Sequence, residues 1–548
     1  MPLYLHNVER WHPTVFFGRY QDDSIYFSSA KALAEGRGYI IPSFPGAPAQ
    51  TKYPIVYPWL LSFIWKWHPA FPENLKQGVR LTEFFGCWSL LVSFLLLRKL
   101  PGIGQWPALF LVALCAVSPI FLRLSGVVMT EVPFMALLLT AALLADSAKR
   151  QGAAALCAIA TGVVAGLSVG MRTIGIAVVA GILLAALWRR AYRQAILFCA
   201  AAGFVMAIES WPMLFHRTAA ESQTTGEPGW QQVWVYYTNY AAFWRMSVPG
   251  IGAFLRMVKS NLLLLISAPG PFVVAPLSGP TTVLRTILFS VLTVLIVAGI
   301  VRRERGQEWK PIHFVLLVYC AVLLVWPFPQ MDRFLLPFLP LFFAGLWVET
   351  PRIVALLRAN LGQGTVLPPA LAAGVAAILV GVFGFTLWDY LIVDPRLLQL
   401  AAASRAHPMD EKRQAYKWIR EHTDPGVRIA ASDDAVLYLY TGRQALRPVV
   451  FLPSGDFMSD KRILTHDLAH ITDAARHVGA QFWLTSDDEA ELKDRDLIAA
   501  RMAEIKSVLP VVFHSRDNTV QVRDASCLLE TQRADCQAAL PVLFPPEP

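Results

Sequence analysis

The sequence predicts a polytopic α-helical membrane protein that ends in a soluble α/β domain. Of its 548 residues, 55% are hydrophobic and only 16% are charged, and the mean hydropathy is +0.46. This composition is typical of chains whose main solvent is the lipid bilayer. The apolar residues also gather in long runs as far as Trp388, and polar and charged residues become frequent after it. The change in composition marks the start of the soluble domain.

About ten visible apolar runs are long enough to cross a bilayer, whose hydrocarbon core needs roughly 20 mostly apolar residues. The expected spans are 79–97, 106–122, 132–147, 153–171, 173–188, 194–215, 282–301, 311–328, 334–349 and 366–388. Basic residues fall in alternate connecting loops, namely Arg98 and Lys99; Lys149 and Arg150; Arg189, Arg190 and Arg193; Arg302, Arg303, Arg305 and Lys310; and Arg352 and Arg358. The positive-inside rule places these loops in the cytoplasm, so the net charge of +9 reflects orientation in the membrane and predicts no nucleic-acid partner.

This topology divides the chain into three parts. Residues 1–78 form a first extracytoplasmic loop with an acidic motif and interfacial helices, 79–390 form the transmembrane domain, and 391–548 form an extracytoplasmic α/β domain. No apolar run in residues 1–20 could carry the first loop across the membrane, so we expect that a first span is missing because the start codon is placed too late. Residues 250–281 are expected to form a membrane-surface helix, because a full span would break the charge alternation.

The C-terminal domain shows patterns of both helix and strand. Residues 414–422 are expected to form a helix, and strands are expected at 427–431, 481–485, 508–514 and 520–522. Cys527 and Cys536 lie in the same polar region, and in an oxidising periplasm this pair would close a small loop by a disulfide.

The first loop carries two adjacent carboxylates, Asp22 and Asp23, ahead of a helical pattern at 24–34. One aspartate is enough to cap a helix, so the second is not explained by capping. Lys52 lies in the same loop, within the segment Lys52-Tyr53-Pro54. A lysine at this position either extends to the membrane surface or binds a lipid phosphate as a point charge, and the residue pattern leaves both readings open.

Three more charged residues, Glu131, Arg172 and Arg333, lie at outer ends of predicted spans. Each has an ordinary explanation. Glu131 would be an acid that stabilises a helix N-terminus, Arg172 would lie in a turn at the membrane surface, and Arg333 would pair with Asp332. Together with the residues of the first loop, however, all of them map to one face of the bilayer, where ionisable groups are costly and usually functional. Such groups suit transfer from a lipid-phosphate donor, because a carboxylate can deprotonate a hydroxyl or orient a metal while cations stabilise the leaving phosphate.

The order of these motifs resembles that of the GT-C polytopic glycosyltransferases, in particular proteins with an RgtA/B/C/D-like domain, which are related to protein O-mannosyltransferases and the lipid A aminoarabinose transferase. The resemblance covers roughly residues 15–350. It rests on Asp22-Asp23 with Ala34-Glu35-Gly36-Arg37-Gly38-Tyr39, on Lys52-Tyr53-Pro54 with Tyr57-Pro58, on Met129-Thr130-Glu131, and on Asp332-Arg333-Phe334-Leu335-Leu336-Pro337. The resemblance implies an inner-membrane enzyme that moves a hexosyl or pentosyl group from a polyprenyl-phosphate sugar to an extracytoplasmic acceptor (a glycan, lipid or protein), with inversion.

The resemblance also implies roles for individual residues. Asp22 or Asp23 would be the general base and Glu131 a second acid. Lys52 and Arg333, and less closely Arg172, would bind the donor phosphate. The tyrosines expected to line the substrate pocket are Tyr26, Tyr53 and Tyr57. A divalent metal is compatible with this chemistry and is left open.

Two functions from other classes remain as alternatives. A transporter or flippase of lipid-linked sugars would place its binding groups near the membrane midplane, often in repeated halves. A non-catalytic scaffold that presents the soluble domain would tolerate substitutions in the acidic loop.

Overall fold

A computed structural model of the chain describes residues 2–11, 17–18, 20–147, 154–215, 226–273, 283–303, 309–362, 384, 388, 394–456, 460–487, 495–530 and 536–545. The chain forms two compact units. The helical unit consists of residues 1–15, 79–207 and 258–401, and the mixed unit consists of residues 16–78, 208–257 and 402–548. The first loop and the C-terminal residues therefore belong to the same unit.

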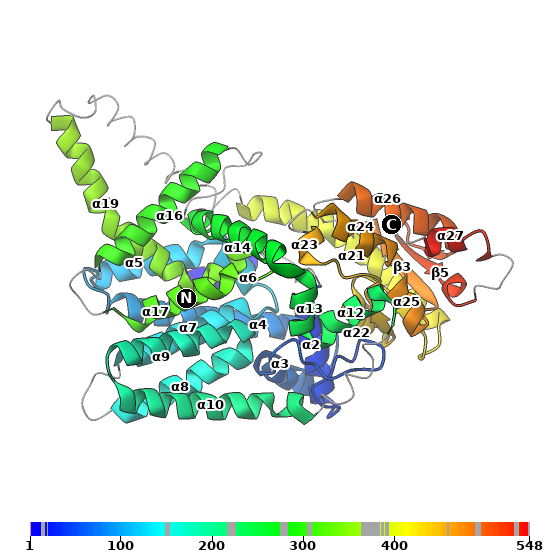
Figure 1. The fold of residues 1–548 in the computed structure, drawn as a ribbon, viewed down its shortest axis with the longest axis horizontal. Helices are drawn as coiled ribbons and strands as arrows, with labels where there is room; N and C mark the ends of the chain where they lie inside the picture. The colour runs from blue at the N-terminus through cyan, green and yellow to red at the C-terminus, as the bar shows by residue number, and fades with distance from the viewer. Residues whose placement is uncertain are drawn as a thin grey trace. The chain divides into compact units, whose positions relative to one another are not determined.

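The helices of the helical unit are drawn in Figure 1. They are α1 (Pro2–Trp11), α4 (Leu75–Leu97), α5 (Gln105–Val117), α6 (Pro119–Ser125), α7 (Glu131–Ser147), α8 (Ala154–Met171), the 3-10 helix η1 (Thr173–Gly175), α9 (Ile176–Trp188), α10 (Tyr192–Phe215), α16 (Val283–Arg303), α17 (Pro311–Leu324), α18 (Met331–Leu335), the 3-10 helix η3 (Leu336–Phe338) and α19 (Leu339–Gly362). Gly299 of α16 lies against Gly345 of α19, where an added Cβ would come within 1.9 Å of a backbone oxygen. Small residues at such a crossing let two helix backbones approach closely.

Five helical stretches of the described residues are long and apolar enough to cross a membrane: Leu75–Leu97, Ala154–Met171, Tyr192–Trp211, Gly250–Val273 and Met331–Ile353. Three shorter apolar helices occupy Thr173–Trp188, Thr286–Arg302 and Pro311–Leu324. Most of the expected span 366–388 lies outside the described residues. The described part of the chain therefore supports a polytopic helical protein, but it does not confirm ten spans.

The expected span 106–122 is not one straight helix. It is broken at Ser118 into α5 and α6, which meet at a bend of 60°. Pro119 causes the break, because proline disfavours helical backbone at the residue before it, and Ser118 has an extended conformation (φ −63°, ψ 127°). A bent pair of this kind is either one broken span or a re-entrant segment.

The segment 250–273 also differs from expectation. It forms α14 (Gly250–Ser267) and α15 (Gly270–Val273), which together are long and apolar enough to cross a membrane. The side-chain amide of Asn261 in α14 donates hydrogen bonds to the carbonyls of Leu323, Leu324 and Trp326 at the end of α17. Length and composition therefore allow a span here, whereas the charge alternation predicts a surface helix.

The mixed unit combines helices with a sheet. Its helices are α2 (Asp22–Ala34), α3 (Val56–Trp67), α12 (Pro228–Thr238), α13 (Tyr240–Ser247), α21 (Asp394–His422), α22 (Asp434–Thr441), α23 (Pro453–Asp456), α24 (Lys461–Ala469), α25 (Asp473–Val478), α26 (Arg495–Val508), the 3-10 helix η6 (Ser526–Leu528) and α27 (Leu540–Leu543). Its strands are β1 (Arg428–Ala430), β2 (Gln444–Leu446), β3 (Phe482–Ser486), β4 (Val511–His514) and β5 (Val520–Asp524).

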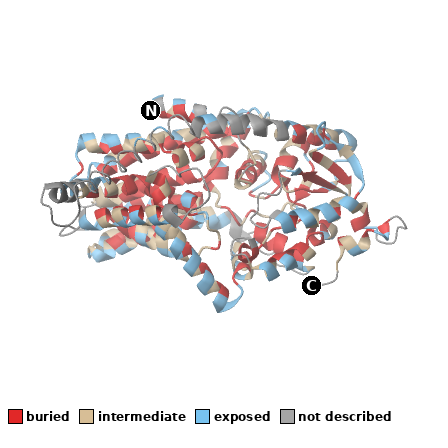
Figure 2. Cartoon of the chain, turned by 90° about the horizontal axis from the view of Figure 1, so that it is seen from above, coloured by how far each residue is buried: buried red, intermediate tan, exposed pale blue. Residues whose placement is uncertain are grey.

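The five strands form one mixed sheet in the order β2-β1-β3-β5-β4. The strand β1 runs parallel to β2 and β3, while β5 runs antiparallel to β3 and β4. Its inner strands are mostly buried (Figure 2), and Ile429, Leu484 and Val522 belong to a core that also includes Tyr416 and Ile419 of α21. Cys527 and Cys536 are joined by a disulfide.

Candidate functional site

The two adjacent aspartates begin α2 and have different surroundings. The N-cap position belongs to Gln21, whose side chain makes no capping bond, so neither aspartate is the N-cap residue. Asp23 is fully buried, and its two carboxylate oxygens accept hydrogen bonds from the backbone amides of Ser24 (2.8 Å) and Gly18 (2.9 Å). Burial raises the pKa of Asp23 to about 7. These contacts hold the start of α2 against the preceding turn.

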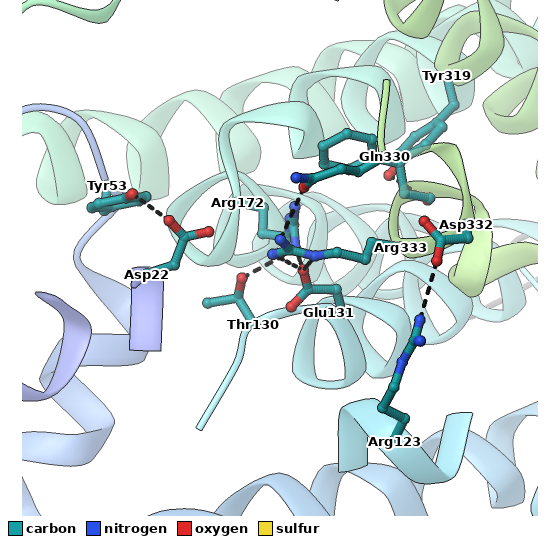
Figure 3. Close-up of polar contacts among 11 residues, drawn as sticks. Asp22, Tyr53, Arg123, Thr130, Glu131, Arg172, Tyr319, Gln330, Asp332 and Arg333 are labelled. Carbon is teal, nitrogen blue, oxygen red and sulfur yellow. Dashed lines mark hydrogen bonds and ion pairs between the residues drawn. The ribbon is translucent and has the colours of Figure 1, made fainter. Parts of the chain in front are cut away.

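Asp22 is only partly buried and points to another partner. Its Oδ1 accepts a hydrogen bond of 2.5 Å from the hydroxyl of Tyr53 (Figure 3). Burial, reinforced by the charge of Asp22, raises the pKa of Tyr53 well above its ordinary value, so this hydroxyl stays a donor. The rings of Tyr26 and Tyr53 are 4.9 Å apart and those of Tyr26 and Tyr57 are 5.7 Å apart. The three tyrosines expected in a pocket therefore form one cluster beside Asp22.

Lys52 precedes Tyr53 in the same segment and is almost fully buried, with 8% of its surface exposed. Its Nζ lies 3.2 Å from the ring centroid of Tyr236, 4.9 Å from that of Tyr53 and 5.6 Å from that of Tyr240. Burial lowers the pKa of Lys52. A lysine enclosed by aromatic faces in this way is held by cation–π attraction, and it does not extend freely to a membrane surface. Lys52 is therefore an enclosed cation, and its role as a phosphate ligand stays a prediction.

Glu131, Arg172 and Arg333 form a separate cluster in the helical unit (Figure 3). Glu131 is the first residue of α7 and is 1% exposed. Its Oε1 is 2.7 Å from Nη1 of Arg172, and it accepts hydrogen bonds from Nε (2.8 Å) and Nη2 (2.5 Å) of Arg333. Two guanidinium groups thus share one carboxylate, and the three side chains together carry a net charge of +1. The cluster is suited to holding an anion.

Arg333 does not form the ion pair with Asp332 that its ordinary explanation required. Asp332 accepts instead from Nη2 of Arg123 at 3.1 Å. Arg333 also donates to the side-chain oxygen of Gln330 at 3.0 Å, and Arg172 donates to Oγ1 of Thr130 at 3.3 Å. The remaining oxygen of Glu131, Oε2, is buried and makes no hydrogen bond within the described residues.

Several polar residues of the mixed unit were missed by the sequence interpretation. Asp434 is buried and accepts a hydrogen bond of 3.0 Å from the hydroxyl of Tyr237, while Asp433 forms an ion pair of 2.5 Å with Lys412. Burial raises the pKa of Asp434 to about 6. The available signals were the aromatic-rich segment 230–244 and the sequence Ser432-Asp433-Asp434 after a strand. In the part of the chain that the structure describes, no group of three or more His, Cys, Asp or Glu residues is placed to hold a metal ion, so no metal ligands are assigned.

Comparison with solved structures finds the same fold in several of them, two of which are described below. ArnT from Cupriavidus metallidurans, bound to undecaprenyl phosphate, matches with a TM-score of 0.54 and 13% identity over 96% of this chain and 97% of that chain. The oligosaccharyltransferase AglB from Archaeoglobus fulgidus, in complex with an inhibitory peptide and a dolichol-phosphate, matches with a TM-score of 0.50 and 13% identity over 96% of this chain and 73% of that chain. No protein-family model and no curated protein matches the sequence.

Proposed function

Because the chain has the GT-C fold, we propose that it is a membrane glycosyltransferase that moves a hexosyl or pentosyl group from a polyprenyl-phosphate sugar to an acceptor outside the cytoplasm. The observation that carries this proposal is the group formed by Asp22, Tyr53 and Lys52. It sets a partly exposed carboxylate, a hydroxyl donor and an enclosed cation on two short segments of one unit.

In this proposal Asp22 is the general base. It takes the proton from an acceptor hydroxyl, whose oxygen attacks the anomeric carbon on the side opposite the phosphate and so inverts that carbon. Tyr53 holds the carboxylate in place, and Asp23 fixes the first turn of α2 on which Asp22 stands. Since Asp23 has both of its oxygens occupied by backbone amides, it is the poorer candidate for the base.

The cations stabilise the leaving phosphate. Lys52 supplies a point charge, and the lowered pKa of this buried amine reflects a site where an anion partner would be favoured. In the helical unit, Glu131 holds Arg172 and Arg333 by ion pairs, and the resemblance implies that these two arginines bind the donor phosphate. Fixed cations in a site from which water is excluded act on developing charge more strongly than they do in water.

Single substitutions of the two aspartates test the proposal. Membranes containing Asp22→Asn should lose sugar transfer from radiolabelled polyprenyl-phosphate sugars by about 10²- to 10⁴-fold, the usual contribution of a general base. Asp23→Asn should keep far more activity than Asp22→Asn, because both oxygens of Asp23 are already bound to backbone amides. Asp410→Asn, which removes an exposed carboxylate, is the matched control. Full activity of Asp22→Asn in correctly inserted protein would remove the assignment.

A further inference from the structure

The mixed unit that contains Asp22 and Lys52 also contains the C-terminal sheet. Arg447 directly follows β2, and Ser432 lies shortly after β1, which is parallel to β2. The carboxyl ends of both strands therefore meet at one edge, which is where open α/β sheets usually bind their ligands. Nε of Arg447 donates a hydrogen bond of 3.2 Å to the carbonyl oxygen of Ser432, which fixes the root of the guanidinium at this edge.

The two terminal nitrogens of Arg447 are not used by the hydrogen bond to Ser432. Tyr236, Tyr237 and Asp434 act on this guanidinium electrostatically, and the Tyr237 hydroxyl donates to Asp434. Within the described residues Arg447 makes no ion pair, and its two terminal nitrogens make no hydrogen bond. Burial alone would lower the pKa of Arg447, yet these tyrosines and acidic groups raise it, so the group stays charged.

Lys52 lies within electrostatic reach of the same guanidinium. The ring of Tyr236 covers the Lys52 ammonium, and the next residue, Tyr237, donates a hydrogen bond to Asp434. Asp434 is two residues after Ser432, whose carbonyl binds Arg447. The charge of Arg447 helps to lower the pKa of Lys52, which is the effect of a repulsion between like charges. Neither Lys52 nor Arg447 is paired with a carboxylate in the described residues. Their mutual repulsion would be relieved by an anion that both of them contact.

We propose that Arg447 is a second cationic ligand, beside Lys52, for the phosphate of the polyprenyl carrier, so that the C-terminal domain supplies part of the substrate site. The inference rests on the proposed function and adds to it a binding residue from a region for which the sequence indicated no role. Arginine suits the task because its planar fork can donate two parallel hydrogen bonds to phosphate oxygens, while Lys52 acts as a point charge.

The test is carrier binding by the purified full chain in nanodiscs, with undecaprenyl phosphate as the probe. Arg447→Gln should weaken binding roughly tenfold or more, which corresponds to about 1.4 kcal/mol, and Arg447→Lys should weaken it less. Arg462→Gln removes an exposed arginine of the same domain and should leave binding unchanged. Binding of uncharged undecaprenol should be the same in all variants, and the melting temperatures show whether each variant is folded.

Several outcomes overturn the proposal. Unchanged undecaprenyl phosphate binding in Arg447→Gln, with weakened binding in Lys52→Gln, would reject Arg447 alone and leave the proposed function standing. Equal losses for undecaprenyl phosphate and undecaprenol would assign Arg447 a structural role. Inorganic phosphate is the second probe. If Arg447→Gln loses binding of inorganic phosphate but still binds undecaprenyl phosphate, Arg447 binds a phosphate other than that of the carrier, such as one on the acceptor. No binding of undecaprenyl phosphate by the unaltered chain would reject the proposed function itself.

Discussion

At the scale of single residues, the ion cluster around Glu131 shows how a buried charge is kept in place. Arg172 and Arg333 are only 15% and 10% exposed, and both are balanced by one carboxylate oxygen of Glu131. Glu131→Gln leaves two buried guanidiniums without a counter-charge, and breaking such a buried pair costs about 3–5 kcal/mol. We expect a clear fall in melting temperature and loss of transfer. Glu35→Gln, at an exposed pair, should change neither. An unchanged melting temperature for Glu131→Gln would contradict the burial of this cluster.

Asp23 should make the stability of the mixed unit depend on pH. Its pKa is about 7 in the folded chain and its ordinary value is 3.8, with burial as the main cause and Asp22 and Asp433 adding to it. Between these values the folded chain binds more protons than the unfolded chain, so the free energy of unfolding falls as pH rises from about 4 to about 7. The fall is at most about 4 kcal/mol, at about 1.4 kcal/mol for each pKa unit.

The measurement is the melting temperature between pH 4.5 and pH 8, followed by tryptophan fluorescence. In Asp23→Asn this decline should flatten above pH 6. Below pH 6 a residual slope should remain, because Asp434, whose pKa is raised to about 6, contributes with the same sign. A parent protein whose stability rises over this range would show that Asp23 is not buried in the neutral form.

At the scale of elements, apolar runs and residue periodicity predicted many of the long helices and most strands, whereas the short helices of the mixed unit were not given bounds. The helix expected at 24–34 is α2, and the expected strands at 427–431, 481–485 and 520–522 match β1, β3 and β5 with small shifts. The strand expected at 508–514 begins only at Val511, because the helix α26 continues to Val508. The strand β2 was missed because, unlike the equally short β1, it lies between Arg443 and Arg447 and is not part of a longer apolar run.

Some residues of the candidate site could likewise be proposed from the sequence, and others could not. Asp22, Lys52 and Glu131 were found because ionisable residues are unusual beside apolar runs. Tyr236 and Arg447 could not be found, since their roles depend on chain segments about two hundred residues apart or more being brought together. Local spacing carries no record of such contacts, and an aromatic residue or an arginine in a polar loop has many ordinary explanations.

At the scale of the whole molecule, the alternation of basic loops predicts that the C-terminal domain lies outside the cytoplasm, and the Cys527–Cys536 disulfide fits an oxidising compartment. Reporter cysteines test this in a chain that keeps the disulfide and has its five other cysteines, Cys87, Cys115, Cys157, Cys199 and Cys320, replaced. A membrane-impermeant maleimide should label a cysteine at the exposed position of Arg516 in intact spheroplasts. It should label one at Arg190 only after permeabilisation, because that loop is expected in the cytoplasm. The reverse pattern would overturn the sidedness on which the extracytoplasmic acceptor depends, since Lys52, Asp22 and the C-terminal sheet belong to one unit.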